Sequence, residues 1–104
     1  MDAGSYDCGT STYPLLGYTI GEMLNRIARK YPRTDALVSV HQGIRYTYGE
    51  FFERVNDLAR GLMAIGVEKG DRVGIWAMNH AEWVLTQCAT AKIGAIMVNI
   101  NPAY

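Results

Sequence analysis

The side chains best suited to acid–base or nucleophilic chemistry are two histidines and two cysteines. His41 and His80 accompany no Ser or Cys nucleophile motif, and their separation is not a metal-ligand spacing. Cys8 and Cys88 form neither a C-x-x-C pair nor a mixed Cys/His pattern, so we expect neither a zinc site nor a disulfide. We therefore assign no catalytic and no metal-binding residue. Cys88 is interpreted as a small buried apolar residue, and both histidines as structural or solvent-exposed.

The acidic side chains give no stronger signal for catalysis. Glu53 and Asp57 lie on one predicted helix, but nothing in the sequence makes them a functional dyad. We interpret this helix face as solvated, with Glu50 placed N-terminal to Arg54 at the i,i+4 spacing of an ion pair, which contributes only about 0.2–0.5 kcal/mol. Neither standard phosphate-binding turn, G-x-G-x-x-G or G-x-x-x-x-G-K-[ST], is present. No cofactor-binding residue is assigned.

Three aromatic residues offer a weaker hint of a binding site. Trp76, Trp83 and Tyr104 are able to line an apolar pocket, but aromatic residues on buried strands and helix faces more often belong to the core. We take the core as the main interpretation and the pocket as the alternative. Asn79 has the position of a helix N-cap, which is sufficient reason for an Asn there.

The elements that carry these residues follow from local patterns. Residues 1–18 show no periodicity and are predicted to form an irregular leader. Thr19 and Glu22 have the capping-box pattern, and the helix that they begin is stopped by Pro32. Its apolar stripe comprises Ile20, Met23, Leu24, Ile27, Ala28 and Tyr31.

A hairpin and a long helix are predicted next. Residues 36–40 and 44–48 indicate two strands joined by a short turn. Thr47 and Glu50 repeat the capping box, and Gly66 is expected to end the helix. The apolar face of that helix comprises Phe51, Val55, Leu58, Leu62 and Ile65.

The last third of the sequence indicates a parallel βαβ unit. Residues 72–77 and 95–100 alternate too little to face water and are predicted to be buried strands. Between them, residues 79–93 form a predicted helix with Asn79 as N-cap and Gly94 as terminator. Short connections of this kind place the two strands in parallel with the helix on one face.

The predicted fold class is therefore α/β: helix, β-hairpin, long helix, then the βαβ unit. Parallel sheets usually have more than two strands and helices on both faces. We therefore expect residues 19–104 to be a partial N-terminal α/β subdomain of a larger enzyme. Isolated, such a subdomain is expected to cover its open sheet by self-association.

Composition excludes several classes of partner. Ten basic and ten acidic side chains give a formal net charge of zero, and no stretch concentrates one sign. A nucleic-acid interface requires a basic stripe, so we expect no nucleic acid partner. No apolar stretch is long enough to span a bilayer and the opening residues lack a secretory pattern, so we expect a cytoplasmic protein.

Two longer stretches resemble a known family. GVEKGDRVGIWA, beginning at Gly66, and GAIMVNINPAY, ending at Tyr104, are similar to the N-terminal region of AMP-forming acyl-CoA synthetases, which are fatty-acyl-CoA ligases of the adenylate-forming superfamily. The resemblance continues upstream through PLLG at residues 14–17 and RYTY at residues 45–48. These are scaffold motifs, and the closing NINPAY is the part most typical of the fatty-acyl branch.

The resemblance implies a full-length ligase that uses ATP and Mg²⁺ to convert a fatty acid to an acyl-adenylate, and then passes the acyl group to coenzyme A. The family's Ser/Thr/Gly-rich phosphate loop, ribose-binding aspartate and C-terminal lysine match no position here. We therefore transfer no functional residue and expect this chain alone to be inactive and to bind no cofactor. Two alternatives remain: a standalone α/β interaction or binding module, and an adenylate-forming ligase for an aryl or amino acid.

Overall fold

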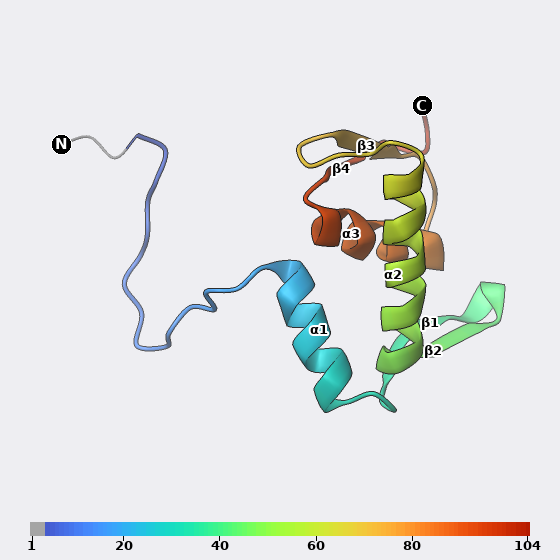
Figure 1. Cartoon of the computed structure of the whole chain (residues 1–104), viewed down its shortest axis with the longest axis horizontal. Helices are drawn as coiled ribbons and strands as arrows, with labels where there is room; N and C mark the ends of the chain where they lie inside the picture. The colour runs from blue at the N-terminus through green and yellow to red at the C-terminus, as the bar shows by residue number, and fades with distance from the viewer. Residues whose placement is uncertain (1–3) are drawn as a thin grey trace.

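The computed structural model describes residues 4–104 (Figure 1). The first three residues of the expected leader lie outside the described residues. From residue 4 to residue 18 the chain contains no helix and no strand, and it extends away from the folded part.

The remaining chain has the predicted order of elements. A first helix, a β-hairpin and a long helix are followed by a strand, a helix and a second strand, which confirms the α/β class and the βαβ unit. The four strands form two separate two-stranded sheets. The elements are α1 (Ile20–Lys30), β1 (Asp35–Ser39), η1 (Val40–Gln42), β2 (Ile44–Thr47), α2 (Tyr48–Ala64), β3 (Arg72–Ile75), α3 (Ala81–Ile93) and β4 (Ile96–Asn99).

Helix α1 begins where the sequence predicts, although only half of its capping box forms. The Thr19 hydroxyl accepts a hydrogen bond from the Glu22 backbone N–H at 3.1 Å. The Glu22 carboxylate binds Arg26 at 3.2 Å instead of reaching back to the backbone of Thr19. The second half of the capping box requires the Glu22 carboxylate, which here pairs with Arg26 one turn along the helix.

Helix α2 has the complete capping box. The Thr47 hydroxyl accepts from the Glu50 N–H at 3.2 Å, and the Glu50 carboxylate accepts from the Thr47 N–H at 3.1 Å. These bonds to Thr47 hold the pKa of the Glu50 carboxyl below its ordinary value. The expected Glu50–Arg54 ion pair is therefore not formed, and the Arg54 guanidinium lies over the Tyr46 ring, 5.6 Å from its centre. Gly66 ends the helix as predicted, with a φ of 100°.

The two strands of the βαβ unit are adjacent and parallel, as predicted. Arg72 pairs with Ile96, and the register continues to the pair of Ile75 with Asn99. The prediction that both strands are buried is wrong. Their outward positions remain open, with Ile96 46% and Val98 41% exposed, because α3 covers only one face of the pair.

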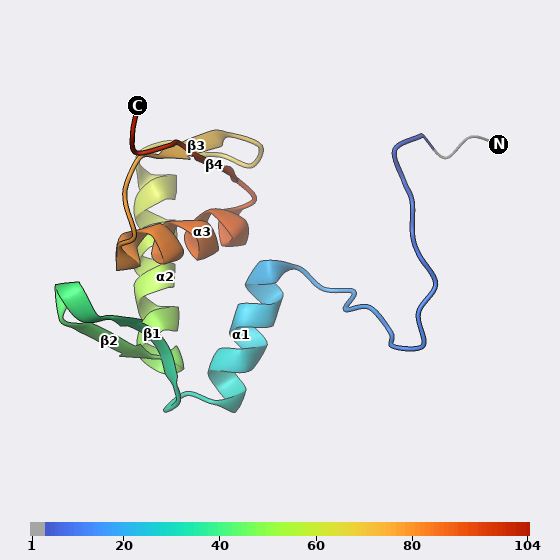
Figure 2. The ribbon, with the colours of Figure 1, turned by 180° about the vertical axis from the view of Figure 1, so that it is seen from behind.

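The core lies where three helices meet. In Figures 1 and 2, α3 crosses α2, and the hairpin and the β3–β4 pair lie at opposite ends of α2. Val55 and Ala89 are fully buried, and Leu24, Phe51 and Ala59 complete the cluster. The apolar face predicted for α2 thus supplies the core, except that its last member, Ile65, is 79% exposed.

Replacing Val55 with Ala is expected to destabilise the fold by about 1–3 kcal/mol. The substitution removes two methyl groups from the side chain and leaves a void that close-packed neighbours fill incompletely. Urea unfolding followed by circular dichroism measures the change. Met63→Ala, on an exposed part of the same helix, is the control and should shift stability by less than about 0.5 kcal/mol. Equal effects of the two substitutions would contradict this placement of the core.

Candidate functional site

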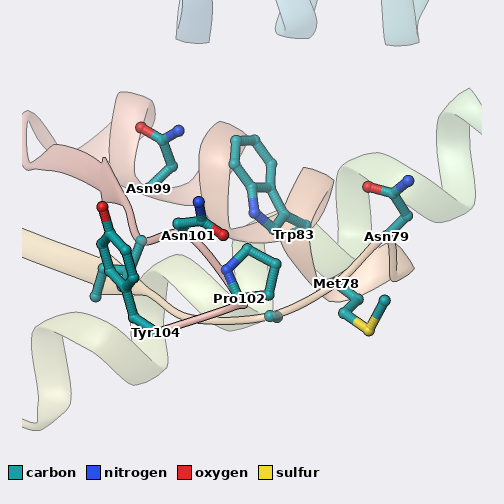
Figure 3. A pocket seen from close by; sticks show the side chains of 9 residues that line it. Met78, Asn79, Trp83, Asn99, Asn101, Pro102 and Tyr104 are labelled. Atoms are coloured by element: carbon teal, nitrogen blue, oxygen red, sulfur yellow. The ribbon is translucent and has the colours of Figure 1, made fainter.

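A cavity of about 610 Å³ lies at the carboxyl ends of the two parallel strands (Figure 3). Ligands of open α/β sheets bind at this end of the strands, because the loops that follow the strands converge there. The cavity is lined by Ala77, Met78, Asn79, Trp83, Asn99, Ile100, Asn101, Pro102 and Tyr104. The described residues therefore place a candidate binding site in the segment that carries the family resemblance.

The cavity combines aromatic and amide groups. Trp83 of α3 and Tyr104 contribute rings, and three asparagines contribute amides, as Figure 3 shows. No carboxylate, imidazole, amine or thiol lines it, so its lining is suited to binding an uncharged group. The alternative interpretation of Trp83 and Tyr104 as pocket residues thus fits the structure. Trp76 fits neither interpretation, because it is 64% exposed and does not line the cavity.

Asn79 is not the cap of α3, which corrects the sequence prediction. The helix begins two residues later, at Ala81, and its N-cap residue His80 makes no side-chain cap bond. The Ala81 N–H instead donates to Oε1 of Gln42, at the end of the hairpin turn, at 2.8 Å. A cap supplied from 39 residues away leaves no local pattern that would predict it.

Gln42 makes further bonds that join the hairpin to α3. Its Oε1 also accepts from the Ser39 hydroxyl at 2.7 Å, and its Nε2 donates to the Glu82 carboxylate at 3.1 and 3.3 Å. The bond from Gln42 is the main cause that holds the pKa of the Glu82 carboxyl below its ordinary value. Because the folded-state pKa is lowered, this contribution to stability is present above the unfolded-state value and is lost as pH falls through the folded-state value.

A second cavity, of about 370 Å³, lies between the hairpin and the start of α3. His41 and His80 line it, and the centres of their rings are 5.3 Å apart. Asn79 and Trp83 line both this cavity and the first. The structure thus brings together the two histidines that the sequence left as separate residues.

The remaining candidates occupy structural positions. Asp57 pairs with Arg60 at 2.9 Å, and Glu53 is exposed, which agrees with the interpretation of a solvated helix face. Cys88 packs against the core, and burial raises the pKa of its thiol, whereas Cys8 is exposed. Among residues 4–104, no group of three or more His, Cys, Asp or Glu side chains is placed to hold a metal ion.

Lys92 links α3 to α2, a contact that the sequence did not predict. Its Nζ donates to Oδ1 of Asn56 at 2.6 Å and lies 4.1 Å from the centre of the Phe52 ring. Burial lowers the pKa of this ammonium group. The only hint in the sequence is a lysine on the apolar side of a helix end. Its partners Asn56 and Phe52 lie 36 and 40 residues away on α2, so no local pattern identifies them.

The sequence matches a known protein family over most of its length. The sequence profile of a family described as AMP-binding enzyme matches residues 24–104, which is more than half of the chain. The chain belongs to the AMP-binding enzyme family. Within residues 4–104, no helix combines the length and hydrophobicity needed to cross a membrane.

This chain has relatives among acyl-CoA ligases and synthetases. It is 47% identical over 100 residues to the mitochondrial medium-chain acyl-CoA ligase ACSF2 of Danio rerio, a match of 96% of this chain and 16% of that protein. It is 48% identical over 90 residues to the putative acyl-CoA synthetase YngI of Bacillus subtilis, a match of 86% of this chain and 16% of that protein. The chain therefore spans about one sixth of the length of these relatives.

Solved structures show the same fold. The N-terminal domain of FACL13 from Mycobacterium tuberculosis is 36% identical, with a TM-score of 0.80 over 84% of this chain and 22% of that chain. The N-terminal subdomain of Klebsiella oxytoca NpsA, in complex with anthranilyl-AMSN, is 29% identical, with a TM-score of 0.77 over 83% of this chain and 22% of that chain. The α/β arrangement is thus that of the N-terminal part of these proteins.

Replacing Gln42 with Leu is expected to lower stability by about 1–3 kcal/mol. The Ala81 N–H and the Ser39 hydroxyl belong to buried residues, and each loses its partner. The pKa of Glu82 should rise toward its ordinary value, which NMR titration of its carboxyl carbon measures.

Gln87→Leu, on the exposed face of α3, is the matched control and should change neither the stability nor the pKa of Glu82. The stability deficit of the Gln42 variant should shrink as pH falls below the ordinary Glu value of 4.5, because wild type loses the contribution of the lowered Glu82 pKa. An unchanged Glu82 pKa in Gln42→Leu would contradict the bond between the two side chains.

Proposed function

We propose that this chain is scaffold from the N-terminal part of an acyl-CoA ligase that activates a fatty acid with ATP and Mg²⁺ and transfers the acyl group to coenzyme A. The observation that carries the proposal is the 43–48% identity to acyl-CoA ligases and synthetases across nearly the whole chain. Membership of the AMP-binding enzyme family supports the use of ATP and coenzyme A by the full-length protein.

The proposed reaction has two balanced steps. A carboxylate oxygen attacks the α-phosphorus of ATP, forming the acyl-adenylate as pyrophosphate leaves. The thiol of coenzyme A then loses its proton to solvent and attacks the carbonyl carbon, and AMP leaves with the carbon–oxygen bond electrons as the thioester forms. Charge that develops on phosphorus needs a cation and basic donors. The first cavity has none, which supports assigning this segment to scaffold rather than to the catalytic centre.

An aryl acid is the second candidate substrate. NpsA was solved with anthranilyl-AMSN, and its TM-score of 0.77 is close to the 0.80 of FACL13. The fold alone therefore does not distinguish a ligase for fatty acids from a ligase for aryl acids. Sequence identity favours the fatty acid, since it is 47% to the Danio rerio medium-chain ligase and 29% to NpsA. The same identity favours a ligase segment over a standalone module.

We also propose that the protein acts in the cytoplasm. Its balanced charge and ordinary globular composition support no anchoring to a membrane surface. The word mitochondrial belongs to the names of the ACSF2 relatives. Fractionation of cells that express the native protein distinguishes the two compartments, and recovery in mitochondria would refute this part of the proposal.

The 104-residue chain alone is expected to release no pyrophosphate above background when supplied with ATP, Mg²⁺, coenzyme A and medium-chain fatty acids. A chimera of the Danio rerio ligase, in which residues 24–104 replace the corresponding segment, should instead keep fatty-acid-dependent thioester formation. Sustained pyrophosphate release by the isolated chain would refute the scaffold assignment. A folded chimera without activity would refute the assignment to acyl-CoA ligases.

We further propose that the isolated chain self-associates through the open face of β3 and β4. Trp76, Ile96, Val98 and Ile100 are exposed and belong to these strands or directly follow them. Both strands are sheet edges, with backbone groups available to another copy. Burial of apolar surface contributes about 25 cal/mol per Å², which favours association through such a face.

Light scattering coupled to size exclusion at micromolar concentration should find a mass that rises with concentration. Val98→Lys should shift the population to monomer, because burying an unpaired ammonium group in the contact is costly. Met63→Lys adds the same charge to exposed surface of α2 and should leave the association unchanged. A concentration-independent monomer in wild type would refute self-association.

A further inference from the structure

The two histidines of the sequence meet at the second cavity although they are 39 residues apart. His41 belongs to the hairpin turn η1, and His80 is the N-cap residue of α3. Both side chains are on exposed residues, and their rings stand edge to face at 74°, with centres 5.3 Å apart. The hydrogen bonds of Gln42 hold the two backbone segments together at this point.

This separation fits two imidazoles on a single metal ion. A metal–nitrogen bond of about 2.0–2.1 Å puts the metal about 3.2 Å from the centre of each ring. At a tetrahedral angle, two such rings have centres about 5.2 Å apart, and at a right angle about 4.5 Å. The observed 5.3 Å is close to the tetrahedral value, and both histidines are exposed.

The surroundings favour a cation. The negative charge of the Glu82 carboxylate interacts with both imidazoles, and Gln42 holds that carboxylate in place. Glu82 is not positioned as a third ligand, because no triad of ligating side chains occurs in the described part of the chain. The adjoining cavity of about 370 Å³ has room for water molecules to fill the remaining coordination positions.

We propose that His41 and His80 together bind one divalent ion of the imidazole-preferring class, such as Zn²⁺ or Ni²⁺, with water as the other ligands. The ion would link the hairpin to the start of α3 and thereby stabilise the same junction as Gln42. This inference concerns the folded chain itself and does not depend on the proposed ligase activity.

The test is titration of the untagged 104-residue chain with ZnCl₂ or NiCl₂ after treatment with chelator. Isothermal calorimetry should find one ion per chain, and saturating metal should raise the melting temperature. His41→Gln and His80→Gln should each weaken binding by at least about tenfold, because the second imidazole acts at high effective concentration only when both are present. Both substitutions lie on exposed residues, so the folded state should persist.

Two controls separate this site from other ligands. Cys8 carries an exposed thiol, and thiolates are zinc ligands, so the Cys8→Ser variant tests whether the ion is bound elsewhere: its affinity and stoichiometry should be unchanged. Mg²⁺, which prefers oxygen ligands, should produce no shift in melting temperature. Imidazole proton signals of both histidines should broaden together on addition of Ni²⁺. Affinity that is equal in wild type and both histidine variants, or that disappears in Cys8→Ser, would overturn the proposal.

Discussion

The crossing of α2 and α3 is the contact on which the rest of the structure depends. Val55 of α2 and Ala89 of α3 are both fully buried in the same cluster. A small residue such as alanine lets helices approach closely, and close packing at the crossing fixes their relative direction. The hairpin is then fixed at one end of α2 and the β3–β4 pair at the other. Both cavities include residues from the N-terminal end of α3.

Local signals in the sequence predicted most of the fold. The Thr47–Glu50 capping box, the apolar face of α2 and the terminating Gly66 involve residues within a few turns of one another, and the structure confirms them except for Ile65, the exposed last member of the apolar face. The parallel pairing of β3 and β4 also followed, because short connections through a helix allow little else. These features depend on backbone preferences and periodicity, which a single sequence displays.

Long-range polar contacts were beyond the sequence analysis. Gln42 caps α3 from the hairpin, and the helix begins at Ala81 instead of at the predicted Asn79. The meeting of His41 with His80 depends on the same junction. The burial of β3 and β4 was overestimated for a related reason. An apolar strand indicates that burial against another element is favourable, but it does not identify the element that packs on it.

The bond from Ala81 to Gln42 makes one backbone amide a reporter of the whole hairpin–helix junction. An N–H in the first turn of a helix has no partner within that helix, so Ala81 would exchange its proton quickly if α3 stood alone. Here its exchange requires the bond to the Gln42 side chain to break. The rate at which this amide takes up deuterium therefore gives the free energy of opening between two segments that are distant in sequence, without any substitution in the chain.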